Sequence, residues 1–252
     1  MESLFLSDLH LDAGRTDIAA TLSWVLSGPA RRAAAVYILG DLFESFIGDD
    51  DPDALALAVA DELQQLSASG VPVYFQHGNR DFLIGTDYAA RAGLRLLGET
   101  HTLDLHGVPT LLLHGDTLCS DDHAYQRLRQ EWRDPAWQAA FLAQPLAERR
   151  AFASRAREAS RAYTAAADRT LMDVNADAVV DCFRKHQVDR IIHGHTHRPA
   201  IHPAEQIDGR ACQRIVLGDW HRSGSLLRVS DQAVELIELP LLAAPAPKEQ
   251  NP

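Results

Sequence analysis

The sequence predicts an α/β fold with helices on both faces of the sheet, because apolar, β-prone runs alternate with segments of helical spacing. Residues 4–8, 33–39 and 71–75 form the first three runs, and residues 17–26 and 53–67 between them have the helical pattern. Five such runs along the chain end in Asp, Asn or His. Ligands bind at the carboxyl ends of strands in these sheets, so we expect the five ends to form one site.

The first run ends in Asp8 and His10, two residues apart. Side chains alternate between faces along a strand, so we expect both to point the same way and to suit a divalent cation. If this pair stood alone, an aspartate in a turn beside a surface histidine would be the ordinary interpretation.

The second run ends at Gly40-Asp41, and the third leads into Gly78-Asn79-Arg80-Asp81. The acidic run Asp49-Asp50-Asp51 lies between them. We interpret it as the solvated start of the helix at 53–67, and its carboxylates are not among the expected metal ligands.

From residue 94 the pattern changes to short β segments at 94–97, 102–105 and 108–113, with a hairpin turn at Gly107, and the last segment ends at His114. Helical spacing then replaces the β pattern from about 121 to about 171, which predicts a helical insertion of three helices capping the sheet edge. Its arginines make it locally basic, and most of them are expected to form a solvated surface: Arg149, Arg150, Arg155, Arg157, Arg161 and Arg169.

The β pattern returns at 190–193 and leads into His193-Gly-His195-Thr-His197. A strand at 211–217 and a hairpin of 225–229 and 233–238 follow. The chain has 252 residues and 46% hydrophobic content, enough to bury the core of a single domain, which we place at 1–240. Residues 243–252 are rich in Pro, Ala, Lys and Gln and are expected to be disordered.

Composition excludes several classes of protein. No apolar segment approaches the roughly 20 residues that span a bilayer, and no basic region or cleavage site precedes the first strand, so we expect a cytoplasmic location. The three cysteines lack the number and spacing of a disulfide framework or a zinc site. The net charge of -11 argues against nonspecific nucleic-acid binding, and an anionic substrate would need metal ions or local arginines.

The five strand ends carry Asp-x-His, Gly-Asp, Gly-Asn, His and Gly-His-x-His, an order that resembles the calcineurin-like metallophosphoesterases. The resemblance implies a two-sheet sandwich flanked by helices and two divalent metal ions about 3.5–4 Å apart. It implies that one metal is bound by Asp8, His10 and His197, that the other is bound by Asn79, His114 and His195, and that Asp41 bridges them. His77 and His193 lie outside this pattern and are expected to support the backbone or a ligand.

Arg80 stands where many enzymes of this class have a histidine that assists the leaving oxygen. An arginine stays protonated at pH 7 and is no useful general acid. The leaving group should therefore need no proton, which favours a phosphate released from a pyrophosphate bond. Arg80 would instead bind phosphate oxygens and offset developing charge.

Longer forms of the five motifs are Ser-Asp8-Leu-His10-Leu, Gly40-Asp41-Leu-Phe-Glu44, His77-Gly-Asn79-Arg80-Asp81-Phe82, His114-Gly-Asp116 and His193-Gly-His195-Thr-His197-Arg-Pro. Together with the helical insertion, they resemble the UDP-2,3-diacylglucosamine pyrophosphatase family of lipid A biosynthesis. This implies attack by a metal-activated water on the α-phosphorus of UDP-2,3-diacylglucosamine, giving UMP and 2,3-diacylglucosamine 1-phosphate (lipid X). It also implies Mn2+ as the metal and the cytoplasmic face of the inner membrane as the location. The substrate contacts that it implies are Asn79, Arg80, Asp122, Tyr125, Arg157, Ser160, Thr164, Ala167 and His195.

Three positions depart from that family. Thr164 and Ala167 stand where it often has amide or basic side chains, and Phe46 where it often has Trp. The acyl chains would need an apolar groove, for which the insertion and nearby loops offer Phe46, Phe82, Phe141 and Phe152, unless these simply form its core. Arginines and aromatic residues together would suit peripheral attachment to a membrane surface.

Other functions remain open at this point. One is another calcineurin-like phosphodiesterase, phosphoprotein phosphatase or nucleotide pyrophosphatase, and another is a noncatalytic metal-binding scaffold that recognises a partner. The chain shows no coiled-coil heptads, and we expect a monomer.

Overall fold

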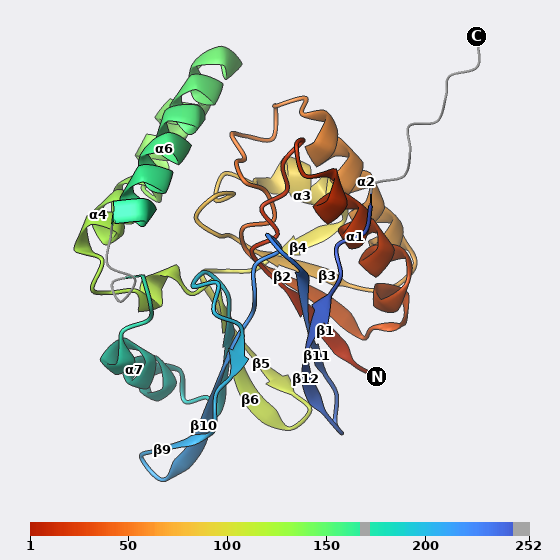
Figure 1. Cartoon of the computed structure of the whole chain (residues 1–252), viewed down its shortest axis with the longest axis vertical. Helices are drawn as coiled ribbons and strands as arrows, with labels where there is room; N and C mark the ends of the chain where they lie inside the picture. The colour runs from red at the N-terminus through yellow and green to blue at the C-terminus, as the bar shows by residue number, and fades with distance from the viewer. Residues whose placement is uncertain (167–171, 244–252) are drawn as a thin grey trace.

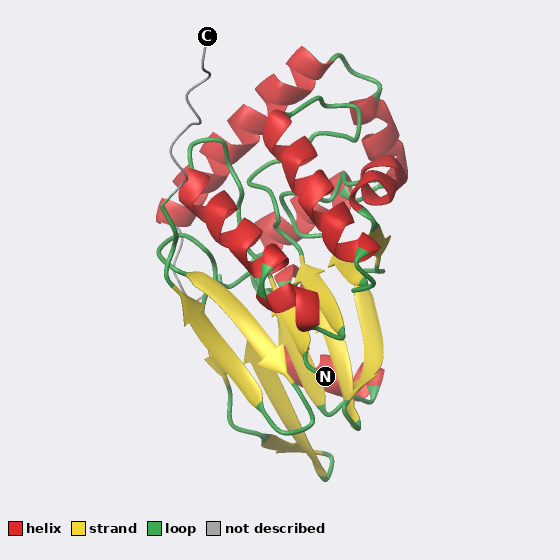
Figure 2. Cartoon of the chain, turned by 90° about the vertical axis from the view of Figure 1, so that its right-hand side faces the viewer, coloured by secondary structure: helices red, strands yellow, loops and turns green. Residues whose placement is uncertain are grey.

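Two β-sheets pack face to face in the computed structural model, which describes residues 1–166 and 172–243 (Figures 1 and 2). The described residues do not include Ala167, a predicted substrate contact. They also exclude residues 244–252, which make up all but the first residue of the tail predicted to be disordered. The first sheet has the strand order β12-β11-β1-β2-β3-β4. Its strands are β1 (Ser3–Leu6), β2 (Ala35–Leu39), β3 (Val73–Gln76), β4 (Leu94–Leu96), β11 (Gly224–Val229) and β12 (Val234–Leu239).

The second sheet has the order β5-β6-β7-β10-β8, with β9 paired to β10. Its strands are β5 (Thr100–Leu105), β6 (Val108–Leu113), β7 (Arg190–His193), β8 (Ala200–Ile201), β9 (Glu205–Ile207) and β10 (Arg210–Val216). β1 to β4 run parallel to one another, as do β6, β7 and β10. The carboxyl ends of parallel strands therefore come together within each sheet.

Alternating side chains of each strand fill two separate cores. Phe5 of β1 packs between the sheets, whereas Leu4 and Leu6 pack under the helices on the outer face. Because both faces of β1 are buried, its sequence reads as a continuous apolar run. Each such side chain contributes about 1.5–3 kcal/mol by its burial.

Helices cover the outer face of each sheet. The first sheet packs against α1 (Thr16–Ser27), α2 (Ala54–Ala68) and α3 (Thr86–Ala92), and the short helix η1 (Pro29–Arg32) follows α1. The second sheet packs against α7 (Ala176–His186), whose Phe183 meets Ile191 of β7 in a third buried cluster. The predicted flanked two-sheet sandwich is confirmed, although α3 and α7 were not predicted.

Three further helices lie between β6 and α7, where three helices were predicted. They are α4 (His123–Trp132), α5 (Pro135–Leu142) and α6 (Leu146–Ala166), preceded by the short helix η2 (Asp116–Leu118), and we call α4, α5 and α6 the cap helices. In Figure 1, α4 and α6 lie on the left, and α1 and α2 lie on the right. The loops that follow the strands lie between these two groups of helices.

The interpretation of the acidic run as a solvated helix start was wrong. Asp49 accepts hydrogen bonds from the backbone N–H groups at the start of α3, at 2.8–3.0 Å. Asp50 and Asp51 form ion pairs with Arg149 and Arg150 at the start of α6. The run therefore joins the loop after β2 to α3 and to the cap helices, and Arg149 is buried with 2% of its surface exposed.

Candidate metal centre

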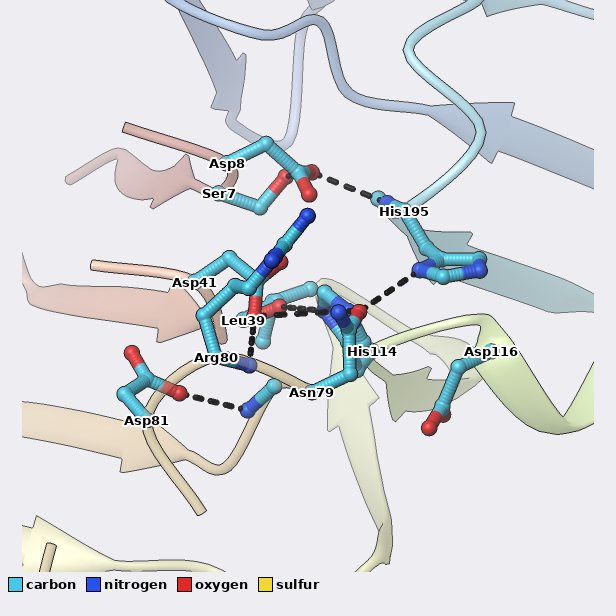
Figure 3. A network of polar contacts seen from close by, with 12 residues as sticks. Ser7, Asp8, Leu39, Asp41, Asn79, Arg80, Asp81, His114, Asp116 and His195 are labelled. Carbon is cyan, nitrogen blue, oxygen red and sulfur yellow. Dashed lines mark hydrogen bonds and ion pairs between the residues drawn. The ribbon is translucent and has the colours of Figure 1, made fainter. Parts of the chain in front are cut away.

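The polar side chains predicted at the strand ends converge beyond the carboxyl edges of both sheets. Figure 3 shows Asp8, Asp41, Asn79, His114 and His195 turned toward one another from five separate loops. These loops follow β1, β2, β3, β6 and β7. Parallel strands in two facing sheets therefore bring together residues that lie up to 187 positions apart.

The backbone at these strand ends is unusual. Five of the predicted ligands have the left-handed conformation that ordinary residues rarely adopt, with φ of 54° at Asp8, 50° at His10, 52° at Asp41, 68° at His195 and 55° at His197. Hydrogen bonds hold two of these turns, from Asp8 N–H to Gly40 O at 3.1 Å and from His10 N–H to Asp41 O at 2.9 Å. Left-handed residues in such number are typical of functional sites.

The structure corrects the reason given for pairing Asp8 with His10. β1 ends at Leu6, so strand alternation does not set the direction of either side chain. The two left-handed residues turn the chain after the strand, and this turn brings both side chains to the site. The predicted proximity is right, but its predicted cause was wrong.

Asp8, His10 and His197 form a group able to hold a metal ion, with one donor atom of each within 4.8 Å of the others. His197 Nε2 lies 3.4 Å from Asp8 Oδ1 and 3.3 Å from His10 Nε2. Asp8 Oδ1 is buried and receives no hydrogen bond. A buried carboxylate oxygen without a donor is costly unless a cation lies beside it, so this group fits a metal ion.

A second group contains Asp8, Asp41 and His114, again within 4.8 Å. Asp41 faces both groups, since its Oδ1 lies 3.8 Å from His114 Nε2 and its Oδ2 lies 3.8 Å from His10 Nε2. Asn79 Oδ1 lies 3.0 Å from His114 Nε2 and 2.9 Å from His195 Nδ1. All seven predicted ligands thus belong to one connected cluster.

Burial and the neighbouring charges shift the pKa values of the clustered side chains in opposite directions. Burial alone would raise the pKa of Asp8, but His197 and the other nearby histidines hold that pKa well below its ordinary value. Burial would likewise lower the pKa of His197, yet the carboxylates of Asp219 and Asp8 beside it raise it to about 10. Burial, with the neighbouring His114 charge, lowers the pKa of His195 to about 4. Such opposed shifts within one cluster of side chains are typical of functional sites.

The groups that orient these histidines were not predicted. His10 Nδ1 lies 3.1 Å from Glu44 Oε2, His197 Nδ1 lies 3.2 Å from Asp219 Oδ2, and His114 Nδ1 lies 2.8 Å from Leu39 O. Glu44 and Asp219 stand in Gly-Asp-Leu-Phe-Glu and Gly-Asp-Trp, so their place near a strand end was a usable signal. His77 and His193 bond the backbone carbonyls of Ile84 and Gly194, as predicted.

The chain is similar to known proteins over most of its length. Residues 1–199 match the family model described as calcineurin-like phosphoesterase. A protein of Stenotrophomonas maltophilia (strain K279a) named UDP-2,3-diacylglucosamine hydrolase is 57% identical over 236 residues, which cover 91% of this chain and 95% of that protein. A protein of the same name from Xanthomonas campestris pv. campestris (strain ATCC 33913) is 51% identical over 96% of this chain and 100% of its own length. The chain belongs to the UDP-2,3-diacylglucosamine hydrolase family of calcineurin-like phosphoesterases.

A solved archaeal phosphodiesterase is a far more distant match, 12% identical over 95% of this chain and 100% of its own, with a TM-score of 0.45. The calcineurin-like phosphoesterases are dinuclear metal-dependent hydrolases, and this chain is therefore an enzyme of that class. Divalent metal ions are accordingly expected in this hydrolase, and the two groups described above have donors suited to them.

Arg80 of this hydrolase lies between the cap helices and the cluster of seven predicted ligands, which we call the metal-type cluster. Its backbone N–H donates to Asp41 Oδ1 at 2.8 Å, and its guanidinium donates to Ser160 Oγ on α6 at 3.2 Å. Arg157 and Arg161, also on α6, lie 3.7 Å from Asp12 and 3.4 Å from Glu44. One face of α6 is thus turned toward the loops that carry the site.

The remaining predicted substrate contacts differ in how they are held. Asp122 is buried and accepts hydrogen bonds from the Tyr125 N–H and the Tyr163 hydroxyl, so it caps α4. The Tyr125 hydroxyl donates to Asp116, and its ring lies 5.8 Å from that of His195. Thr164 falls in the last turn of the described part of α6, and Ala167 lies outside the described residues.

The aromatic residues expected to line an acyl groove are packed against one another. Phe82 and Phe152 contact Trp137, which stacks on Phe141 at 5.0 Å between ring centroids. Phe141 is 4% exposed. Phe46 is also buried and contacts Tyr88 in the main core. These residues therefore form a core, the alternative that the sequence left open.

Proposed function

We propose that this hydrolase cleaves the pyrophosphate bond of UDP-2,3-diacylglucosamine at the α-phosphorus, giving UMP and 2,3-diacylglucosamine 1-phosphate (lipid X) in lipid A biosynthesis. The relatives bearing that substrate's name, at 50–57% identity, support it. The observation that carries the proposal is the position of Arg80, which touches both the metal-type cluster and the cap helices.

We propose that the resident metals are two Mn2+ ions and that the catalytic residues are their seven ligands and Arg80. Asp8, His10 and His197 would hold one ion, Asn79, His114 and His195 the other, with Asp41 between them. When bound, the ions would lower the pKa of a water so that hydroxide is present at neutral pH. Asn79 is neutral, so the ligand carboxylates leave the pair of ions with a positive charge that attracts phosphate.

Arg80 would bind phosphate oxygens through its fork of donors. It stays protonated at neutral pH, so it stabilises developing negative charge and gives no proton to the leaving group. A phosphate leaving from an anhydride is stable as an anion and needs none. This chemistry favours a pyrophosphate substrate over a simple phosphodiester.

We propose that residues 1–240 form one domain with residues 121–171 as a cap over the substrate, and that Asn79, Arg80, Asp122, Tyr125, Arg157, Ser160, Thr164, Ala167 and His195 contact it. The bond from Arg80 to Ser160 and the packing of Tyr125 beside His195 support a site shared between cap and sandwich. We also propose that the protein works as a monomer.

We further propose peripheral attachment to the cytoplasmic face of the inner membrane, because the substrate carries two acyl chains. Arg150 and Arg161 of α6 are more than half exposed, and Leu128, Leu142 and Tyr163 of the cap helices expose apolar surface. Such a surface suits anionic headgroups. In residues 1–166 and 172–243, no helix is long and apolar enough to cross a bilayer. Cosedimentation with vesicles containing anionic lipid tests the proposal, and indifference to lipid would count against it.

The activity is tested by incubating the purified protein and Mn2+ with UDP-2,3-diacylglucosamine in 18O water. We expect label in UMP, and label in the sugar phosphate would overturn the assigned point of attack. Bis-p-nitrophenyl phosphate serves as the control substrate. Faster turnover of this diester than of the UDP-lipid would favour another phosphodiesterase of the same fold.

A further inference from the structure

The two proposed metal-binding groups of the cluster differ in what contacts the far ring nitrogens of their histidines. Glu44, in the loop after β2, lies with its Oε2 3.1 Å from His10 Nδ1 and is 14% exposed. Asp219, in the loop after β10, lies with its Oδ2 3.2 Å from His197 Nδ1. The His221 N–H donates to the other oxygen of Asp219 at 2.9 Å, which holds this carboxylate in place.

Among the described residues, no carboxylate forms an ion pair with the far ring nitrogen of either histidine in the other half. His114 Nδ1 faces the carbonyl of Leu39 at 2.8 Å, whereas His195 Nδ1 lies 2.9 Å from the amide oxygen of Asn79, itself an expected ligand of the same ion. The carboxylate of Asp116 lies in this region, but it is bonded to Tyr125 and Arg129. The half containing His10 and His197 therefore has two more carboxylates behind its ligands than the other half.

We propose that Glu44 and Asp219 are positioning residues that make the group of Asp8, His10 and His197 the tighter of two unequal metal sites. A carboxylate beside the Nδ1 atom of a histidine favours the tautomer with its proton on that nitrogen, which leaves the Nε2 lone pair for a metal and increases its basicity. Two such carboxylate–histidine pairs lie behind the proposed ligands of one ion, and none lies behind those of the other. The inference rests on the proposed dinuclear centre and is independent of the identity of the substrate.

The test is a Mn2+ titration of the metal-free protein, in which the electron paramagnetic resonance of free Mn2+ measures what remains unbound. We expect two classes of site in the parent protein. Glu44→Ala and Asp219→Ala should each weaken the tighter class by about 10- to 100-fold and leave the weaker class within about twofold. Glu44→Gln keeps an oxygen beside His10 Nδ1, so its tighter site should lose less Mn2+ affinity than that of Glu44→Ala.

Several results would overturn the proposal. They are a single class of two equal sites in the parent protein, unchanged tight binding in both alanine variants, or equal weakening of both classes. Melting temperatures of the metal-free variants check that each has folded. If an alanine variant does not fold, Glu44→Gln and Asp219→Asn replace it, because each removes the charge and keeps the shape.

Arg161→Gln is the matched control, since it removes the other ion-pair partner of Glu44 and leaves the contact with His10. Arg161 is 71% exposed, and we expect its variant to bind Mn2+ as the parent does. Weakening equal to that of Glu44→Ala would mean that Glu44 acts through α6, against the proposal. A parent protein that shows two unequal Mn2+ sites and no hydrolysis of the UDP-lipid would refute the proposed substrate and leave this inference standing.

Discussion

The guanidinium of Arg80 donates a hydrogen bond to the hydroxyl of Ser160, 3.2 Å away on α6. The backbone N–H of the same arginine donates to Asp41 (Figure 3), the carboxylate that faces both groups of possible metal ligands. Arg80 is thus held from both sides, by the loop after β3 and by the cap helices. A charged group fixed in advance beside the reacting phosphate costs little reorganisation during the reaction.

Replacing Arg80 by lysine should lower kcat on UDP-2,3-diacylglucosamine by about 100-fold. Lysine keeps the charge but loses the planar fork that binds two phosphate oxygens together. Steady-state kinetics of the purified variant at saturating Mn2+ measures the effect. A kcat within threefold of the parent would show that Arg80 supplies charge alone.

Ser160→Ala is the control for this variant. It removes the partner of Arg80 on α6 and leaves the guanidinium itself in place. We expect a loss of about tenfold, because a hydrogen bond from a charged donor contributes about 1.5–3 kcal/mol and water can replace part of this one. A loss as large as that of Arg80→Lys would mean that the cap, and not the arginine fork, sets the rate.

The strand ends could be predicted from the sequence because each follows an apolar run short enough to be a buried strand. Asp41, Asn79 and His114 were placed correctly for this reason. Asp8 and His10 were placed correctly for the wrong reason, since propensity does not predict left-handed turns at non-glycine residues.

Contacts between distant segments could not be predicted in this way. Asp50 and Arg149 are 99 residues apart, and nothing in either local pattern indicates that the acidic run holds the cap helices. Glu44 and Asp219 were visible as residues near strand ends, but which histidine each faces depends on loop geometry. α7 was missed although its sequence is amphipathic, with Val179, Val180 and Phe183 packed in one buried cluster.

Arg149 and Arg150 are neighbours on α6 that differ in burial, and their variants should differ in stability. Arg149 is 2% exposed and bonds Asp50 and the carbonyls of Ile47 and Gln144, whereas Arg150 is 55% exposed. Arg149→Ala should lower the free energy of unfolding by about 2–4 kcal/mol, because it leaves polar groups unpaired and opens a cavity. Arg150→Ala should cost less than about 1 kcal/mol.

Urea unfolding of the two arginine variants under identical conditions measures the difference. Equal losses would mean that the acidic run does not hold α6 through Arg149. Asp50 is 62% exposed, so most of the expected loss comes from the guanidinium and its carbonyl partners and not from the charge pair.

Gly78 allows the loop after β3 to approach Asp41. A Cβ at this position would lie 2.1 Å from Asp41 Oδ1, so Gly78→Ala must displace that carboxylate or the loop. We expect the variant to bind less Mn2+ at a given concentration and to lose most of its activity. Metal content after dialysis is the measurement. Gly98→Ala, whose Cβ would have 3.5 Å to its nearest neighbour, should keep the metal content of the parent. Full metal retention in Gly78→Ala would contradict the proposed role of Asp41.

His193 lies beneath the cluster as a neutral histidine. Its ring is fully buried, Nδ1 donates to Gly194 O at 2.8 Å, and Nε2 accepts from Arg214 at 3.2 Å. These partners require the neutral ring with its proton on Nδ1. Burial lowers the pKa of His193 to about 3, and the charge of Arg214 acts in the same direction.

Because the folded pKa of His193 lies below the unfolded value of 6.5, the unfolded state takes up a proton first as pH falls. The stability that depends on this residue is therefore present above pH 6.5 and is lost as pH falls from 6.5 toward about 3. Between pH 7 and 5.5 the metal-free parent should lose about 1 kcal/mol more than His193→Asn. Urea unfolding of both proteins in EDTA at the two pH values measures this difference, because all other titrating groups are shared. The same loss in both proteins would show that His193 is not held neutral.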